Sequence, residues 1–332
     1  MKSMKLFSVF LMLVLLFFIV HGISLFINPL DVKDTVVDIK SGETAFQIAQ
    51  KLYDKNIIRS KNWFYLYAKL SKADKDLSYG KFLFYGKMTI SDVLEKIKSG
   101  KVFLKKVTIP EGLTIRKTCR LLTNNGFGDY RKFSSICNDS IFAKKVTGFS
   151  ISSLEGFLFP ETYFFPEDVS EEFIISHLVK EFFRQTADLD FVPNENLDFY
   201  ETIILASIVE REAKVEEEKP IIASVYLNRI ENGYKLQADP TIAYVLEKSG
   251  KSRKKIFYRD LEIISPYNTY KNYGLPPTPI CSPYTTSIEA TLKPAETDYF
   301  FFFANPGGRH EFSQTYSQHL SKQRLLKQEN GK

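Results

Sequence analysis

The amino-terminal run Leu6–Ile27 constrains this chain more than any other feature. It is apolar except at Ser8, His21, Gly22 and Ser24. A helix of about 22 residues, rising 1.5 Å per residue, would cross the roughly 30 Å apolar core of a lipid bilayer. A cleaved signal peptide is the alternative, but its apolar region spans about 7–15 residues and a small-residue cleavage site follows it. Because no such site follows this run, it predicts an uncleaved transmembrane anchor over residues 6–28.

The charges around this run predict its orientation. Lys2 and Lys5 precede it, and a long polar chain follows it. Positive charge is retained in the cytoplasm, so residues 1–5 should form a cytoplasmic tail and the chain after the anchor should lie outside the cytoplasmic membrane. No nucleotide cofactor is expected there, and the sequence has neither a P-loop nor a Rossmann glycine pattern.

Charge and cysteine content exclude further classes of protein. The net charge of +6 is spread over 332 residues instead of forming a basic stripe, which argues against a nucleic-acid-binding protein. Cys119, Cys137 and Cys281 have no CxxC spacing, so zinc and thioredoxin-like chemistry are not expected. The odd count leaves at least one free thiol, and a Cys119–Cys137 disulfide is an open alternative. The four histidines are too scattered to predict a metal site.

Three segments after the anchor repeat one pattern. They span residues 36–58, 82–100 and 107–122, and each places an extended apolar run before a glycine, a threonine and an amphipathic helix. In the first copy, Thr44 and Gln47 form a capping box. Strand–turn–helix units are common, so this similarity alone does not establish a repeat. The helix faces predicted to be buried are Ala45, Ile48, Ala49 and Leu52, then Ile90, Val93, Leu94 and Ile97, then Ile115, Thr118, Cys119 and Leu122.

The character of the chain changes near residue 150. The segment LEGFLFPETYFFPED (residues 154–168) should be extended around its two prolines. A buried strand at 298–304 should turn at 305–308 into a returning strand. With the helices, these strands predict an α+β fold, and the long loop Ser265–Pro283 between them is of a length that is usually functional. Helices are predicted over residues 171–185, 197–213 and 220–232.

The segment IILASIVEREAK, Ile203–Lys214, ends a buried-helix pattern with two carboxylates. In a helix, residues two positions apart point about 200° apart. Glu212 shares the most apolar face with Leu205 and Val209, whereas Glu210 points away from it. A carboxyl against an apolar wall has a raised pKa and can stay a proton donor near neutral pH. Glu212 is therefore a candidate general acid; the alternative is that it only marks the exposed end of a helix.

Several motifs follow one another in a characteristic order. They are LEGFLFPETY, ILASIVEREA, ASVYLNRI, LQADPTIAY, YNTYKNYGLPPTPICSP and HEFSQTYSQH. In this order and spacing they resemble the YceG-like family, the endolytic murein transglycosylases, over nearly the whole chain. The first strand–turn–helix copy separately resembles LysM, a small module that binds glycans containing N-acetylglucosamine. These resemblances imply a LysM-like module over residues 35–105 and a YceG-like catalytic domain over residues 106–332.

The resemblance also implies roles for single residues. In the family the second glutamate of the E-x-E pair is catalytic, and it corresponds to Glu212. Glu210 would instead orient the helix or a neighbouring polar group. Two positions depart from the family pattern, because Glu161 stands where many members have Asp and Cys281 stands where small residues are usual. The remaining substrate-binding or supporting positions would be Glu155, Tyr163, Asn228, Gln237, Asp239, Thr241, Asn268, Thr269 and Tyr270.

The implied reaction uses one acid twice and needs neither a metal nor a cofactor. Protonated Glu212 would donate to the glycosidic oxygen between N-acetylmuramic acid and N-acetylglucosamine. Its carboxylate would then take the proton of the muramyl 6-hydroxyl, which closes on C1 and leaves a 1,6-anhydromuramyl end. The resemblance implies a single-pass protein of the cytoplasmic (inner) membrane, with its C-terminal domain on the outer or periplasmic side. There it would terminate nascent peptidoglycan strands, with peptidoglycan synthases as candidate partners.

Two other functions are compatible with the sequence. One is a non-catalytic tether that holds peptidoglycan through the LysM-like unit. The other is a hydrolytic muramidase in which Asp239 or Glu155 activates water. For the enzyme, we expect residues 237–241 and the loop Ser265–Pro283 to line one groove with Glu212 at its floor, where Asn268 contacts substrate or holds Glu212. The alternative for the loop is that its tyrosines only pack it onto the domain.

Overall fold

The structure is a computed structural model that describes residue 12 and residues 28–100, 104–166, 169–191, 197–251, 253 and 255–330. The chain divides into two compact units. The first comprises residues 1–106 with 164–168, and the second comprises residues 107–163 with 169–332. The predicted anchor lies outside the described residues except for Met12 and Asn28. Among the residues that are described, no helix is both long enough and apolar enough to cross a membrane.

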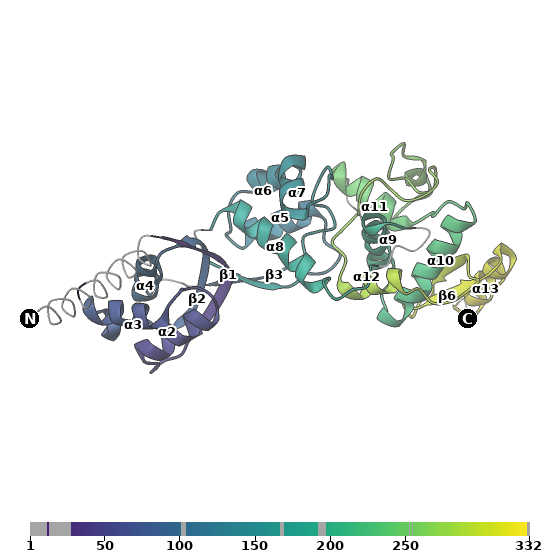
Figure 1. Ribbon diagram of the computed structural model, residues 1–332. Coiled ribbons are helices and arrows are strands. Elements are labelled where there is room, and N and C mark those ends of the chain that lie inside the picture. Colours follow the sequence, from purple (N-terminus) through teal and green to yellow (C-terminus); the bar gives the residue numbers. More distant parts are fainter. Residues whose placement is uncertain are drawn as a thin grey trace, which may run out of the picture. The chain divides into compact units, whose positions relative to one another are not determined.

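The amino-terminal unit is built on two antiparallel strands with helices between and after them (Figure 1). The strands pair in a register that sets Val37 opposite Phe82, and both side chains are buried in the core of the unit. The predicted helix faces of the first two copies are buried in the same core, which confirms their phase. The elements are β1 (Leu30–Ile39), α2 (Ala45–Asp54), α3 (Lys61–Leu70), η1 (Ala73–Lys75), β2 (Gly80–Met88) and α4 (Ile90–Lys98).

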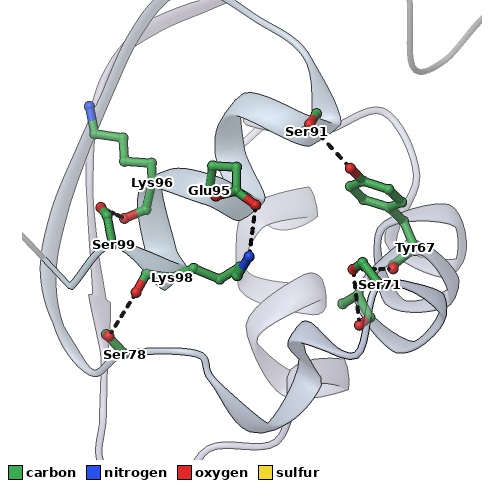
Figure 2. A network of polar contacts seen from close by, with 9 residues as sticks. Tyr67, Ser71, Ser78, Ser91, Glu95, Lys96, Lys98 and Ser99 are labelled. Atoms are coloured by element: carbon green, nitrogen blue, oxygen red, sulfur yellow. Dashed lines mark hydrogen bonds and ion pairs between the residues drawn. The ribbon is translucent and has the colours of Figure 1, made fainter.

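Polar side chains fasten the helices of this unit at their ends. The predicted capping box of α2 is present, since Thr44 and Gln47 each accept a backbone N–H from the other. Figure 2 shows the contacts around α4, where the Tyr67 hydroxyl lies 3.2 Å from that of Ser91 and Lys98 pairs with Glu95 at 2.9 Å. Most of these bonds are exposed, so the apolar core supplies most of the stability of the unit.

The second unit is mainly helical, and its strands are short. β3 pairs with β4, and β5 pairs antiparallel with β6. Of the strands, β3 (Lys105–Thr108) and β4 (Thr162–Phe165) are divided between the two units, whereas β5 (Phe301–Ala304) and β6 (His310–Ser313) lie within the second unit. Its helices are α5 (Ile115–Asn124), α6 (Tyr130–Cys137), α7 (Ser140–Thr147), α8 (Glu171–Gln185), α9 (Phe199–Glu212), η2 (Glu216–Glu218), α10 (Lys219–Glu231), α11 (Asp239–Lys248), η3 (Tyr258–Glu262), α12 (Thr285–Leu292) and α13 (Tyr316–Asn330).

Helix α9 forms the centre of the second unit. It packs against α10, α11 and α12, and every residue from Thr202 to Val209 is buried (Figure 1). A helix that is apolar on all sides is stable only when other elements cover all of it. The helix begins at the capping box of Asp198 and Glu201 and ends at Glu212, because Ala213 is already extended. Both glutamates of interest therefore lie where the buried helix reaches the edge of the core.

Most of the expected elements are confirmed, and the α+β class is confirmed with them. The helices predicted over 171–185, 197–213 and 220–232 are α8, α9 and α10, each within two residues at either end. The strand predicted at 298–304 is shorter than expected and was wrongly predicted to be buried. Only Phe301–Ala304 is a strand, and its side chains are partly exposed because a two-stranded hairpin has no second layer over both faces. All three cysteines are buried and free, so no disulfide joins Cys119 to Cys137.

Candidate active site

The two glutamates at the end of α9 have different partners. The Tyr226 hydroxyl, on α10, donates a hydrogen bond of 2.7 Å to Oε1 of Glu212. Glu210 contacts α12 and the start of α10 instead. The divergence follows from the helical phase, which turns side chains two positions apart to opposite sides. The two carboxyl groups therefore lie in separate environments.

The Glu212 carboxyl has a pKa close to neutral pH. It is half-buried, and burial raises its pKa to about 7. The hydrogen bond from Tyr226 opposes that rise, because it stabilises the carboxylate. The negative charge of Asp239 adds to the rise, whereas Arg229 and Arg211 oppose it. At neutral pH a group with this pKa is populated in both its protonated and ionised forms, as a group that acts first as acid and then as base must be.

Glu210 is an internal brace. Its Oε2 accepts the Tyr284 N–H at 3.1 Å and the Ser287 hydroxyl at 2.6 Å, at the amino end of α12. The Lys219 ammonium lies 3.6 Å away, and the side chains of Lys219 and Glu210 are only 5% and 6% exposed. A carboxylate at a helix amino terminus is favoured by the helix dipole as well as by these donors. Glu210 therefore joins α9 to α10 and α12.

Two loops that the sequence analysis expected in one groove are joined by hydrogen bonds. The Gln237 N–H donates to the Thr269 carbonyl at 3.1 Å, and the Ala238 N–H donates to the Thr269 hydroxyl at 2.9 Å. The Tyr270 hydroxyl donates to Oδ1 of Asp239 at 2.6 Å. Gln237 has a φ of +51°, a left-handed conformation that is costly for a residue other than glycine. The bonds to Thr269 hold this strained turn in place beside Asp239.

A cavity of about 490 Å³, which we call the Tyr270 cavity, opens beside these loops. It combines a carboxylate and a phenol with exposed aromatic rings, since Phe257 is 44% exposed and Tyr258 is 91% exposed. Sugars present apolar ring faces and hydroxyls, so aromatic faces beside polar groups suit them. Asp239 and Tyr270, which line the cavity, are also electrostatic neighbours of Glu212. The lining residues are Asp239, Lys255, Ile256, Phe257, Tyr258, Leu261 and Tyr270.

Asn268 lies inside its loop instead of facing the cavity. It is fully buried, and its amide donates to the Leu261 carbonyl at 2.9 Å and the Ile263 carbonyl at 2.7 Å. Its side-chain oxygen accepts the Tyr270 N–H at 2.9 Å. All of its hydrogen-bonding groups are thus used within the protein. Two roles were expected for Asn268, contact with substrate or a hold on Glu212, but its side-chain bonds reach neither the cavity nor Glu212. They support the loop instead.

Two further residues that the family motifs single out have structural roles away from the Tyr270 cavity. The amide of Asn228 donates to the Thr297 and Tyr299 carbonyls at 2.7 and 3.0 Å, which fixes the segment before β5. The Tyr163 hydroxyl donates to the Phe159 carbonyl at 2.7 Å. Neither of them lines the cavity, and Glu212 is not among its lining residues either.

Glu155 is buried at the amino end of α5. It accepts the Ile115 N–H at 2.9 Å and the Tyr244 hydroxyl at 3.1 Å, and burial raises its pKa to about 7. The next residue, Gly156, has a φ of +95°, and a side chain there would meet Pro279 at 2.6 Å. The Glu-Gly pair therefore lets the loop pack closely while capping α5.

Tyr226 and Arg229 are site residues that the sequence analysis missed. They are three positions apart on α10, so they share a face of that helix. Tyr226 bonds Glu212 directly, and Arg229 donates from Nε to the Phe300 carbonyl at 2.7 Å while its charge acts on Glu212. The available signal was the motif ASVYLNRI, in which a phenol and a guanidinium interrupt a buried apolar helix.

No metal-binding cluster is found in the part of the chain that the structure describes. Among those residues, no group of at least three histidine, cysteine, aspartate or glutamate side chains is placed so that it could hold a metal ion. The polar side chains of the candidate site are Glu212, Tyr226, Asp239 and Tyr270.

Comparison with known proteins identifies the family. The chain belongs to the YceG-like family, whose model matches residues 37–325. A Bacillus subtilis (strain 168) protein named endolytic murein transglycosylase is 31% identical over 321 residues, covering 91% of this chain and 88% of that protein. A Streptococcus pneumoniae (serotype 2, strain D39) protein of the same name is 28% identical over 82% of this chain, which matches 54% of that longer protein.

A solved structure is similar as well. The crystal structure of a YceG-like protein from Listeria monocytogenes has a TM-score of 0.60 and 32% identity to this chain. The match covers 88% of this chain and 99% of that protein. The fold of this chain and the match to the family model therefore indicate the same family.

Proposed function

We propose that this protein is a membrane-anchored endolytic murein transglycosylase. It would cleave the bond between N-acetylmuramic acid and N-acetylglucosamine within peptidoglycan strands and leave 1,6-anhydromuramyl ends. The observation that carries the proposal is the environment of Glu212: one carboxyl, half-buried, bonded by Tyr226, with a pKa of about 7. The names of the relatives from Bacillus subtilis and Streptococcus pneumoniae support the same activity.

The proposed reaction runs in two proton transfers through Glu212. First, the protonated carboxyl donates to the glycosidic oxygen as the bond from that oxygen to the muramyl C1 breaks. Positive charge then develops at C1. Next, the Glu212 carboxylate removes the proton of the muramyl 6-hydroxyl, whose oxygen bonds to C1. The acid is regenerated, no water is consumed, and acid–base help of this kind contributes about 10²–10⁴-fold in rate.

Tyr226 and Asp239 would support Glu212 in these steps. The Tyr226 hydroxyl occupies Oε1, which leaves Oε2 of Glu212 for the substrate. Asp239 is engaged with the Tyr270 hydroxyl and is exposed at the cavity, where its negative charge stabilises the positive charge at C1. A muramidase that activated water through Asp239 would use the same two carboxyls, as paired-carboxyl glycosidases do. The hydrolytic alternative therefore has to be tested through the product.

Product mass distinguishes the two reactions. Purified peptidoglycan is digested with the protein, and the released glycan ends are measured by mass spectrometry. Anhydro ends, lighter than reducing ends by one water, are expected throughout the digest. Reducing ends alone would identify a hydrolase, and intact strands after prolonged incubation would favour the non-catalytic tether.

The location and the small unit belong to the same proposal. Residues 6–28 would anchor the chain, and the β1–α2–α3–β2 unit would act as the LysM-like glycan-binding module. An anchored Glu212 would meet strands near the membrane, where they are made, and would terminate them there. A mature chain whose amino terminus begins just after the apolar run, near Gly22, would contradict the anchor.

The pH profile of the reaction tests the role of Glu212. Because the acid must be protonated, kcat/KM should fall as the pH rises through about 7. Asp239→Asn removes a negative charge that raises the pKa of Glu212, so the alkaline limb should move to lower pH. Tyr226→Phe removes a bond that lowers this pKa, so the limb should move to higher pH. Two shifts in the same direction would contradict this electrostatic account.

Asn268→Ala tests the support of the cavity. The change removes both bonds to the carbonyls of η3 and its neighbour and frees the Tyr270 N–H. Turnover should fall at least about tenfold, roughly 1.4 kcal/mol of transition-state stabilisation. Asn232→Ala is the control, since that exposed amide bonds the Asn228 carbonyl of the adjoining helix α10. Equal activity of the two variants would show that the loop needs no such brace.

A further inference from the structure

A second cavity, of about 790 Å³, lies on the other side of η3 from the Tyr270 cavity. We call it the basic pocket. Its rim carries Lys248, Lys251, Arg253 and Arg259, and its only carboxylate is Asp260. A volume of this size is typical of pockets that bind small organic ligands or short peptides. Its apolar walls are formed by Val245, Leu246, Ile263, Ile264, Pro266 and Tyr267.

The positive charge of the basic pocket is mostly uncompensated. Asp260 is buried and is fully engaged, because Arg253 pairs with one of its oxygens and the Phe257 N–H donates to the other at 2.8 Å. Within the described residues, neither Lys248, Lys251 nor Arg259 forms an ion pair with a carboxylate. Lys248 lies over the rings of Tyr244 and Tyr267, and Arg259 lies over that of Phe257, so Lys251 is the most weakly compensated of the three. Three cations around one cavity attract an anion and repel one another when the cavity holds only solvent.

Arg253 has an unused donor at this pocket. Its Nη2 donates to Asp260, but its buried Nε has no hydrogen-bond partner among the residues that the structure describes. A buried N–H without an acceptor is costly, and a guanidinium is well suited to bind a carboxylate through two donors. Arg253 therefore stands at the edge of the basic pocket with one donor unsatisfied.

The two cavities share one wall. Phe257, Tyr258 and Leu261 line the Tyr270 cavity, whereas Arg259, Asp260 and Ile263 line the basic pocket. The residues alternate because η3 is a helical turn with one face in each cavity. A ligand in the Tyr270 cavity that carries a branch could therefore extend the branch over η3 into the basic pocket.

We propose that the basic pocket binds the carboxylates of the acidic peptide that muramyl residues carry, while the glycan lies in the Tyr270 cavity. The proposal rests on the proposed function, because it takes peptidoglycan as the substrate. Aliphatic walls with a cationic rim fit an extended peptide with small apolar side chains and carboxylates better than they fit a bare phosphate. The branch is long enough: a helix with its side chains is about 10–12 Å across, and an extended peptide spans about 3.3–3.6 Å per residue.

The test compares one set of glycan strands with and without peptides. Peptides are removed with an amidase that cuts the bond between the muramyl lactyl group and the peptide. The wild-type full chain should cleave the peptide-bearing strands with a kcat/KM at least about tenfold higher, mainly through a lower KM. The double variant Lys251→Gln/Arg259→Gln should lose this preference and cleave peptide-free strands as the wild type does. Both side chains are exposed, so the variant should fold normally.

The control variant removes the same charge elsewhere. Lys144→Gln/Lys145→Gln neutralises two exposed lysines on α7, which line neither cavity, and it should keep the preference. The proposal would be overturned if the Lys251→Gln/Arg259→Gln variant had a lower kcat/KM on both substrates. It would also be overturned if the variant had the wild-type kcat/KM on both. Free acidic peptide should inhibit cleavage of peptide-bearing strands, and its fully amidated form should not. Inhibition by glycerol phosphate equal to that by the peptide would assign the pocket to a phosphate ligand instead.

Failure of the proposed function is a separate outcome. If the wild type cleaved neither substrate, the enzymatic assignment would fail, and the pocket would be judged by calorimetric titration with the free acidic peptide. If the wild type bound the peptide and the Lys251→Gln/Arg259→Gln variant did not, the peptide-binding role of the pocket would stand without the enzymatic assignment. Absence of binding, or equal binding by both proteins, would overturn it.

Discussion

Glu212→Gln should lower glycan cleavage by about 10²–10⁴-fold while leaving the protein folded. The amide has the shape of the carboxyl and can still accept the hydrogen bond from Tyr226. It has no proton to donate to the glycosidic oxygen, and it cannot take one from the 6-hydroxyl. The measurements are the rate of release of anhydro ends and the thermal unfolding midpoint of the purified variant.

Glu217→Gln is the matched control for this change. Glu217 is an exposed glutamate of η2, a few residues beyond Glu212, so its neutralisation removes the same charge from the surface. It should keep full activity and full stability. If Glu212→Gln kept more than a small fraction of wild-type turnover at unchanged stability, the assignment of Glu212 as the acid would be wrong.

Glu210→Gln should instead lower the free energy of unfolding, by about 3–5 kcal/mol, because it leaves the Lys219 ammonium buried without its counter-charge. Lys219 would keep its bond to the Thr286 hydroxyl at 2.8 Å and the electrostatic attraction of Glu111. The unfolding midpoint should fall by on the order of 10 °C. Residual turnover, measured below that midpoint, should be close to normal, since Glu210 is bonded to Tyr284, Ser287 and Lys219 and not to the partner of Glu212.

A second substitution separates charge from packing at Glu210. In Glu210→Gln/Lys219→Met the buried ammonium is gone, and stability should recover much of the loss, as is common when a whole buried ion pair is replaced. A double-mutant cycle gives the coupling energy between the two side chains. If well-folded Glu210→Gln lost all turnover while Glu212→Gln stayed active, the two roles would be reversed.

The helices and their caps were predictable because they depend on local patterns. Thr44 with Gln47 forms the capping box of α2, and the buried faces of α2, α4 and α5 have the predicted period. These features need only residues within one or two turns of each other. The strand at 298–304 was the weaker prediction, because burial of a strand depends on which elements cover it and not on its own composition.

The roles of individual site residues depended on partners far away in the sequence. Asn268 was a candidate sugar-binding residue, yet its side chain bonds the Leu261 and Ile263 carbonyls and the Tyr270 N–H. Glu155 belongs to the same family motifs as Glu212, but it caps α5 and does not reach the Tyr270 cavity. A buried polar group takes whichever partner packing brings within hydrogen-bond distance, and the sequence does not state that distance.

The sequence by itself determined the family, the α+β class and the opposite directions of Glu210 and Glu212, because motif order and helical phase are written in the chain. Only the tertiary structure decided the chemistry of each carboxyl. Packing of α10 on α9 brings the Tyr226 hydroxyl to Glu212, and packing of α12 brings the Tyr284 N–H and the Ser287 hydroxyl to Glu210. The physical reason is that a pKa depends on burial and on the charges and donors within a few ångströms, which come from segments distant in sequence.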